Sequence, residues 1–196
     1  MRLRFPESQI NEFAELYVKE MSEKDRISTD AIILDVFPSY EQKGYLTRNE
    51  FLTVCEWKSP RSRPRCESNE ESFIEEVSRL VLTAKSERIK IQAWTLLDGV
   101  QWPTASVFLH FAFPNQYPIL DFRALWSLTM DVPSSYTYPF WEKYINYCRI
   151  LARQAGVTMR ILDQALWKYS EIHQRKSGRG QGIFRANGSA VDAELP

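Results

Sequence analysis

Residues 96–123 read LLDGVQWPTASVFLHFAFPNQYPILDFR, and this stretch decides the fold expected for the whole chain. Asp98-Gly99 marks a tight turn, because glycine takes a positive φ without steric cost. Pro103 suits the first turn of a new helix, where its missing N–H is not needed. The pattern predicts two helices joined by a hairpin, then a short loop that delivers Asp121. Backbone N–H groups at the start of the second helix are expected to form a cradle for a phosphate.

The nine residues from Leu97 to Ala105, LDGVQWPTA, carry a family resemblance. They resemble the helix-hairpin-helix signature of the HhH-GPD superfamily of DNA glycosylases, which reads roughly L-P-G-V-G-x-K-T-A. In that family an essential Asp follows the hairpin Lys position by eighteen residues, and here 121 − 103 = 18. The triplet Asp121-Phe122-Arg123 is also similar to the family's Asp-x-His/Arg pattern. The resemblance is close over about thirty residues and loose over residues 69–170.

Three hairpin positions depart from the family pattern. Asp98 replaces the Pro, Gln101 replaces the second Gly, and Pro103 stands where bifunctional members carry a Schiff-base Lys. The resemblance therefore implies a monofunctional enzyme that uses water as the nucleophile and leaves the DNA strand uncut. It also implies no cofactor beyond a monovalent cation held by hairpin carbonyls.

Asp121 is the catalytic residue that the resemblance implies. Cleavage of an N-glycosidic bond passes through an oxocarbenium-like sugar, so a carboxylate near C1′ would stabilise it and direct a water molecule. The base must first leave the helical stack and enter a pocket. The alternative role for Asp121 is an N-cap, which is frequent for aspartate. The two roles are compatible, since an Asp at a helix start can still face a cleft.

Further site residues follow from the same comparison. The hairpin is expected to hold the phosphates of one strand, although a generic helix–helix corner is the alternative. Trp102 at its tip either contacts a partner or folds back onto the core. His110 either reaches the pocket or is a hydrogen-bonded core histidine. The expected DNA-binding residues are Gly99, Gln101, Trp102, Thr104, Lys58, Arg61 and Arg123, and the expected pocket residues are Trp57 and His110.

Two other function classes stay open at this stage. One is a non-catalytic DNA-binding module that keeps the hairpin but lacks the pocket. The other is a metal-dependent nuclease, because Glu56-Trp57-Lys58 matches the E-x-K fragment of such enzymes. Those nucleases carry the fragment on a strand, whereas here a helix is predicted. The expected partner is double-stranded DNA in each case.

Composition sets broad limits on these hypotheses. The chain has 196 residues and a formal net charge of zero, so a uniformly basic nucleic-acid binder is excluded. Positive charge gathers in two stretches, residues 58–65 and 175–185, which could equally be solvated loops. The three cysteines are scattered, so no structural zinc or iron–sulfur cluster is expected. No run of eighteen apolar residues and no secretory signal is seen, so a cytoplasmic protein is expected. The resemblance to DNA glycosylases implies a nucleoid-associated protein, which we expect to be monomeric.

Hydrophobic periodicity predicts an all-α, compact multi-helix bundle with the helix-hairpin-helix at about 88–113. The expected domains are an N-terminal helical part (1–60) packing on the core, a glycosylase-like core (61–175) and a basic, Gly-rich tail (176–196). Polar residues 25–30 predict a break, Pro38 an end, residues 39–46 a turn and residues 60–65 a basic loop. Thr47 and Glu50 predict a capping box at the start of helix 47–57, and Gly156 is expected to end helix 139–155. Ser68 or Asn69 is the expected cap of helix 69–84. Helices are expected over 7–25, 47–57, 69–84, 86–97, 103–113, 139–155 and 158–174, and a helix of about eight residues is expected to follow Asp121. The buried faces of helices 69–84 and 86–97 should carry Phe73, Val77, Leu80, Val81, Ile89, Ala93, Leu96 and Leu97.

Overall fold

The computed structural model describes residues 1–174, and within them the all-α prediction is confirmed: every regular element is a helix. No helix in this range is both long and apolar enough to cross a membrane. The predicted tail and the basic stretch 175–185 lie outside the described residues. The α-helices are α1 (Ile10–Glu20), α2 (Glu23–Ala31), α3 (Phe37–Lys43), α4 (Arg48–Lys58), α5 (Arg63–Cys66), α6 (Glu71–Thr83), α7 (Glu87–Trp94), α8 (Trp102–Ala112), α9 (Phe122–Ser127), α10 (Tyr138–Ala155) and α11 (Met159–His173).

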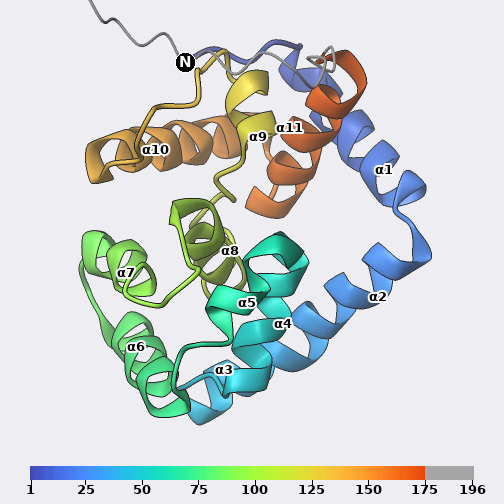
Figure 1. The fold of residues 1–196 in the computed structure, drawn as a ribbon. Helices are drawn as coiled ribbons and strands as arrows, with labels where there is room; N and C mark the ends of the chain where they lie inside the picture. The colour runs from blue at the N-terminus through green and yellow to red at the C-terminus, as the bar shows by residue number, and fades with distance from the viewer. Residues whose placement is uncertain (175–196) are drawn as a thin grey trace, which may run out of the picture.

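The two ends of the described chain lie together. Figure 1 shows α9, α10 and α11 in the upper half with α1 beside them, and α3 to α7 in the lower half. Helix α1 packs against α11, which in turn packs against α9. The N-terminal arm joins the same group, since the N–H groups of Arg2 and Arg4 donate to the carbonyls of Leu128 and Ser127. Helix α2 then carries the chain down to the lower half.

Helix α8 runs through the middle of the molecule and is buried along most of its length. Phe108 on α8 is fully buried, and its ring stacks on Trp94 at 4.2 Å and on Phe51 at 5.6 Å. Stacked rings of this size bury a large apolar area, and only a few side-chain torsions have to be fixed for it. The central helix is thereby fixed against α4 on one side and α7 on the other.

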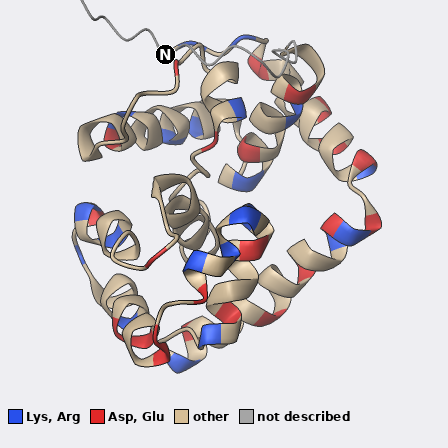
Figure 2. Ribbon diagram, viewed as in Figure 1, with Lys and Arg blue, Asp and Glu red and all other residues tan. Residues whose placement is uncertain are grey.

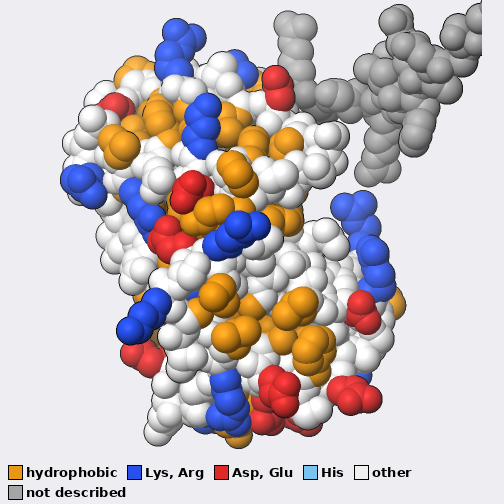
Figure 3. All heavy atoms as spheres, turned by 90° about the vertical axis from the view of Figure 1, so that its left-hand side faces the viewer, with side chains coloured by type: hydrophobic (Ala, Val, Ile, Leu, Met, Phe, Trp, Pro, Cys, Tyr) orange, Lys and Arg blue, Asp and Glu red, His pale blue; other side chains and the backbone are white. Residues whose placement is uncertain are grey.

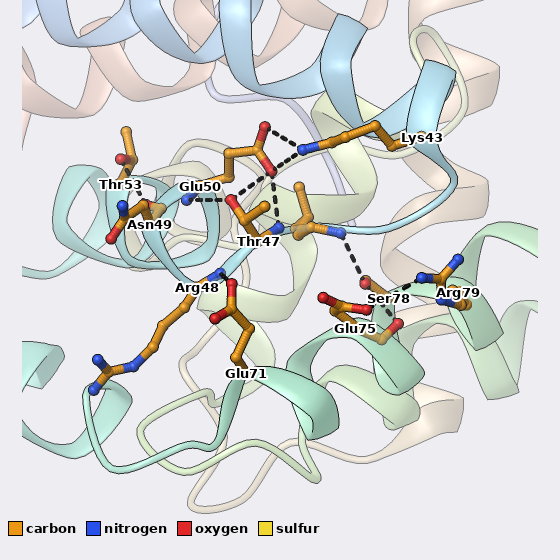
Figure 4. Close-up of polar contacts among 11 residues, drawn as sticks. Lys43, Thr47, Arg48, Asn49, Glu50, Thr53, Glu71, Glu75, Ser78 and Arg79 are labelled. Carbon is orange, nitrogen blue, oxygen red and sulfur yellow. Dashed lines mark hydrogen bonds and ion pairs between the residues drawn. The ribbon is translucent and has the colours of Figure 1, made fainter.

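Local capping signals place several helices where they were predicted. Thr47 and Glu50 form the expected capping box at the start of α4, and Figure 4 shows Lys43 pairing with the same Glu50. A capping box satisfies two helix-start N–H groups at once. Figure 4 also shows Ser78 of α6, whose hydroxyl accepts from the N–H of Leu46. These contacts fix α4, which carries part of the site described below.

Two predicted breaks are wrong. Residues 23–31 form α2, because Ser22 caps the helix by accepting from the N–H of Asp25 and Arg26 pairs with Asp30 one turn later. Pro38 does not end a segment either. It lies in the first turn of α3, where proline is tolerated, so the predicted turn 39–46 is helical up to Lys43.

Two short segments, residues 32–36 and 60–65, are also helical. Residues Ile32–Val36, which periodicity left unassigned, form a π-helical turn. The predicted basic loop 60–65 instead makes a 3₁₀ turn, Pro60–Ser62, followed by α5. Both prolines in it occupy early helical positions, so they start helices where we expected them to stop regular structure.

The predicted buried faces of α6 and α7 are partly wrong. Phe73, Leu80, Ile89 and Leu96 are 40–60% exposed, and Glu70 takes the N-cap position expected of Ser68 or Asn69. Val77, Val81, Ala93 and Leu97 are buried as predicted, and the other inward positions are Ile74, Ser78, Ile91 and Trp94. Figure 3 shows the side of the molecule that carries α6, α7 and α10, and hydrophobic side chains are exposed on both its upper and its lower half. The buried set on α6 and α7 is Ile74, Val77, Ser78, Val81, Ile91, Ala93 and Trp94.

Candidate functional site

A cavity of about 380 Å³ lies between α11 and α9 on one side and α1, α2 and α4 on the other. Aromatic walls come from Tyr17, Trp57 and Trp167, and Asp121 lies on the same cavity. Figure 2 shows blue and red segments facing one another across this region of the ribbon. Eight charged side chains line the cavity as well, so it is more polar than the usual small-ligand pocket.

Asp121 is held at both of its carboxylate oxygens. As the N-cap of α9 it accepts the N–H of Arg123 through Oδ1 at 2.9 Å. Its Oδ2 accepts from the Nζ of Lys58 at 2.7 Å. The two side chains are 16% and 14% exposed, so the pair is partly shielded from water while still open to the cavity. The N-cap role and a cleft-facing position therefore coincide in one residue.

The segment that leads to Asp121, residues 117–120, is fixed by buried side chains from two helices, α8 and α10. His110 on α8 contacts the carbonyl of Tyr117 through Nδ1 at 2.8 Å. The hydroxyl of Tyr144 on α10 donates to the carbonyl of Ile119 at 2.7 Å, and Ser106 accepts the N–H of Leu120 at 2.7 Å. Each backbone group is satisfied without solvent, so the position of Asp121 is set by the core.

His110 is a buried histidine that bonds to the backbone. Burial, together with the nearby charge of Arg160, lowers the pKa of His110 to about 3, against the opposing effect of the hydrogen bond to Tyr117. The imidazole is therefore neutral near pH 7, and Nδ1–H is the nitrogen that can donate to the Tyr117 carbonyl. It lines a second, apolar cavity and does not line the one that contains Asp121. Of its two expected roles, the structure shows the core histidine.

A second ion pair, Arg160 with Asp163 on α11, lies on the same cavity as Lys58 and Asp121. Arg160 Nη1 is 3.0 Å from Asp163 Oδ2, and Asp163 is only 8% exposed. Burial raises the pKa of Asp163 to about 6, against the opposing effects of Arg160 and Lys58 and of a backbone hydrogen bond from Ile119. The negative charge of Asp121 adds to the rise. Asp163 therefore interacts both with the charged residues of the cavity and with the segment before Asp121.

The hairpin forms with the predicted left-handed glycine. Gly99 has φ +79°, and a Cβ added there would lie 2.6 Å from Cys66 Sγ and 2.9 Å from the Cys66 backbone nitrogen. Asn69 ties the same turn to the chain after α5, because its side chain exchanges hydrogen bonds with the N–H and the carbonyl of Asp98. Glycine is thus required by the close packing on α5 as well as by the backbone conformation.

The other predicted hairpin residues do not line the Asp121 cavity. Gln101 is exposed at the N-cap of α8, whereas the Thr104 side chain is buried. Trp102 is half-buried and its ring centre lies 6.4 Å from that of Trp141, so it folds back onto the core. The exposed side chains at this turn are those of Leu96, Asp98 and Gln101.

The remaining predicted residues divide into those at the cavity and those beside it. Trp57 and Lys58 line the cavity, and the indole N–H of Trp57 donates to Thr29 at 3.0 Å. Arg123 lies against the cavity wall, with its guanidinium 5.0 Å from the ring centre of Trp167. Arg61 is exposed in the 3₁₀ turn and does not line this cavity. The structure thus gathers Trp57, Lys58 and Asp121 around one space.

Two site residues, Arg160 and Asp163, were not predicted from the sequence. A signal was present, because these charges lie three residues apart at the start of a helix whose next positions, Ile161, Leu162 and Ala165, are apolar. A charged residue on the apolar side of a helix either pairs with an opposite charge or takes part in a functional site. Within residues 1–174, no group of three or more His, Cys, Asp or Glu side chains could hold a metal ion.

No protein-family model, curated protein or solved structure matches the chain.

Proposed function

We propose that this protein is a monofunctional DNA glycosylase that hydrolyses the N-glycosidic bond of a damaged or modified base in double-stranded DNA. The observation that carries the proposal is the Asp121 carboxylate, held at both oxygens on an aromatic-walled cavity large enough for an extrahelical base. A fixed negative charge at such a position would stabilise the oxocarbenium-like sugar as the base departs.

Each neighbouring residue has a role in this proposal. Asp121 stabilises the sugar cation and directs a water molecule at C1′. Lys58 holds one oxygen of Asp121, and the start of α9 holds the other, so little reorganisation is needed during the reaction. Trp57 and Trp167 stack on the extrahelical base. Water is the nucleophile, since Pro103 offers no amine at the hairpin.

The DNA-binding part of the proposal places one strand along the hairpin. The backbone around Gly99 and Gln101 and the start of α8 would hold its phosphates. Arg61 and Arg123 would contact the backbone on either side of the extrahelical nucleotide. We propose that the protein acts as a monomer on chromosomal or foreign DNA.

The nuclease hypothesis has less support. Glu56 pairs with Arg63, whereas Lys58, two residues later on α4, pairs with Asp121. On a helix, residues two apart point in different directions, so these two side chains do not converge on one metal ion as they would on a strand. A non-catalytic DNA-binding module would leave the fixed carboxylate and the cavity without a role.

The test is abasic-site formation in duplexes that carry a panel of modified bases, with chelator present. We expect wild-type protein to release at least one base, and Asp121→Asn to lose about 10²- to 10³-fold in rate, as for loss of a preorganised electrostatic group. Asp131→Asn is the matched control, because Asp131 is exposed in the loop after α9. DNA binding without base release would favour the binding module, and strand cutting that needs added metal would favour the nuclease.

A further inference from the structure

A second cavity of about 300 Å³ lies directly beside the one that contains Asp121. It lies between the π-helical turn, α3, α6 and α8, and its walls are mainly apolar. The main contributors are Ile33, Phe37, Leu82 and Phe111, with Arg160 at one side. Its chemistry differs from that of the first cavity, which carries five carboxylates and three basic groups.

Arg160 is the boundary between the two cavities, because it lines both of them. Its guanidinium carbon lies 5.8 Å from the ring centre of Tyr17 in the first cavity and 5.4 Å from that of Phe111 in the second. The boundary continues through Trp57, whose ring meets Phe111 edge to face at 5.6 Å. One guanidinium and one aromatic contact therefore separate the two spaces.

The boundary has an unsatisfied donor. Nη1 of Arg160 pairs with Asp163, but Nη2 is buried and has no hydrogen-bond partner among the described residues. A buried guanidinium nitrogen without an acceptor is costly, so native proteins rarely leave one unless a ligand or a water supplies the acceptor. A modest rotation of Arg160 would turn this donor toward a molecule that spans both cavities.

The wall of the second cavity has an unusual backbone. Ile33 belongs to the π-helical turn Ile32–Val36, which runs directly into α3 at Phe37. Single π-helical turns are rare and are found mostly at functional sites, because the extra residue redirects side chains. Here that turn contributes Ile33 to the cavity wall and leaves it 42% exposed.

We propose that the two cavities form one bipartite site that selects bases carrying a bulky apolar substituent. The base ring would lie beside Asp121 and the substituent, of the size of a benzyl group, would fill the apolar cavity across Arg160. A nitrogen or oxygen acceptor on the base would satisfy Arg160 Nη2. This inference names the substrate class of the proposed glycosylase and rests on that proposed function for its biological meaning, although the bipartite site can be tested by itself.

The first test measures binding of free N6-benzyladenine and of adenine to the full chain by calorimetry. Burial of one benzyl group in an apolar site should give N6-benzyladenine at least about tenfold tighter binding than adenine. Ala112→Phe fills the apolar cavity from the last residue of α8 and should abolish the preference, whereas Ala112→Ser should keep it. Equal affinities for the two bases in wild-type protein, or an unchanged preference in a folded Ala112→Phe protein, would overturn the bipartite site.

The second test compares base release from duplexes with N6-benzyladenine, N6-methyladenine or adenine at one position. The expected result is a preference of about tenfold or more in kcat/KM for the benzyl derivative, lost in Ala112→Phe. Release of small bases without this preference would refute the substrate class and leave the glycosylase proposal intact. Tight binding of the free benzyl derivative with no release from any duplex would refute the glycosylase and support the bipartite site.

Discussion

The hairpin turn precedes α8, whereas the segment before Asp121 follows α8 and runs back alongside it, and the two are held in different ways. The hairpin is fixed by close steric packing of Gly99 on Cys66 and by hydrogen bonds of the neutral amide of Asn69. The segment before Asp121 is fixed by His110, Tyr144 and Asp163, all of them buried and all titratable. The conformation of the hairpin should therefore be independent of pH, whereas the position of Asp121 should depend on it.

The largest expected effect comes from His110. Its pKa is about 3 in the folded protein and 6.5 in the unfolded chain, so below pH 6.5 the unfolded chain binds the extra proton. The contribution of His110 to the unfolding free energy is therefore complete above pH 6.5 and is lost as the pH falls, by about 2 kcal/mol at pH 5 and about 4 kcal/mol near pH 3. Urea unfolding of wild type and His110→Gln across pH 4–7 measures this, because the glutamine does not titrate. Parallel stability curves for the two proteins would refute the assignment.

The next effect concerns the hairpin and should not vary with pH. In Gly99→Ala, the new Cβ would meet Cys66 at 2.6 Å and 2.9 Å, and the residue would keep a left-handed φ. Overpacking and left-handed strain together should cost about 2–4 kcal/mol of unfolding free energy. Urea unfolding at pH 5 and pH 7 should show the same loss at both values.

Gly156→Ala is the matched control for this change. Gly156 also has a positive φ, of +65°, but a Cβ there would meet nothing within 4 Å. It should therefore lose only the cost of the left-handed conformation, about 1–2 kcal/mol. A loss in Gly99→Ala no larger than in the control would show that contact with Cys66 does not hold the hairpin.

The same comparison explains what the sequence could and could not predict. The hairpin is local: a Gly turn and a Pro at a helix start lie within a few residues, so the pattern in residues 96–105 was enough to place it. The capping box at Thr47 and Glu50 and the helix end at Gly156 were also predicted correctly, for the same reason. Local chemistry decides such features before tertiary packing contributes.

The surroundings of Asp121 depend on contacts between distant residues. Lys58 and Asp121 are 63 residues apart in the sequence. We expected Lys58 to contact DNA and did not predict that it pairs with the Asp121 carboxylate. Asp163 and Arg160 come from the last helix, and nothing local brings them near residue 121. The exposed positions of Phe73 and Leu80 could not be predicted either, because a helix with apolar residues on more than one side does not reveal which side meets the core.

The last expected effect comes from Asp163, and its pH dependence has the opposite sign to that of His110. Its pKa is about 6 in the folded protein against 3.8 in the unfolded chain, so here the folded protein binds the extra proton. Stability from this residue therefore falls as pH rises from about 4 to 6, by up to about 3 kcal/mol, opposite to His110. Asp163→Asn removes the titration, so its unfolding free energy relative to wild type should rise over that window and be constant above pH 7. A difference independent of pH would show that Asp163 is ionised in both states and that its charge is fully compensated by Arg160 and Lys58.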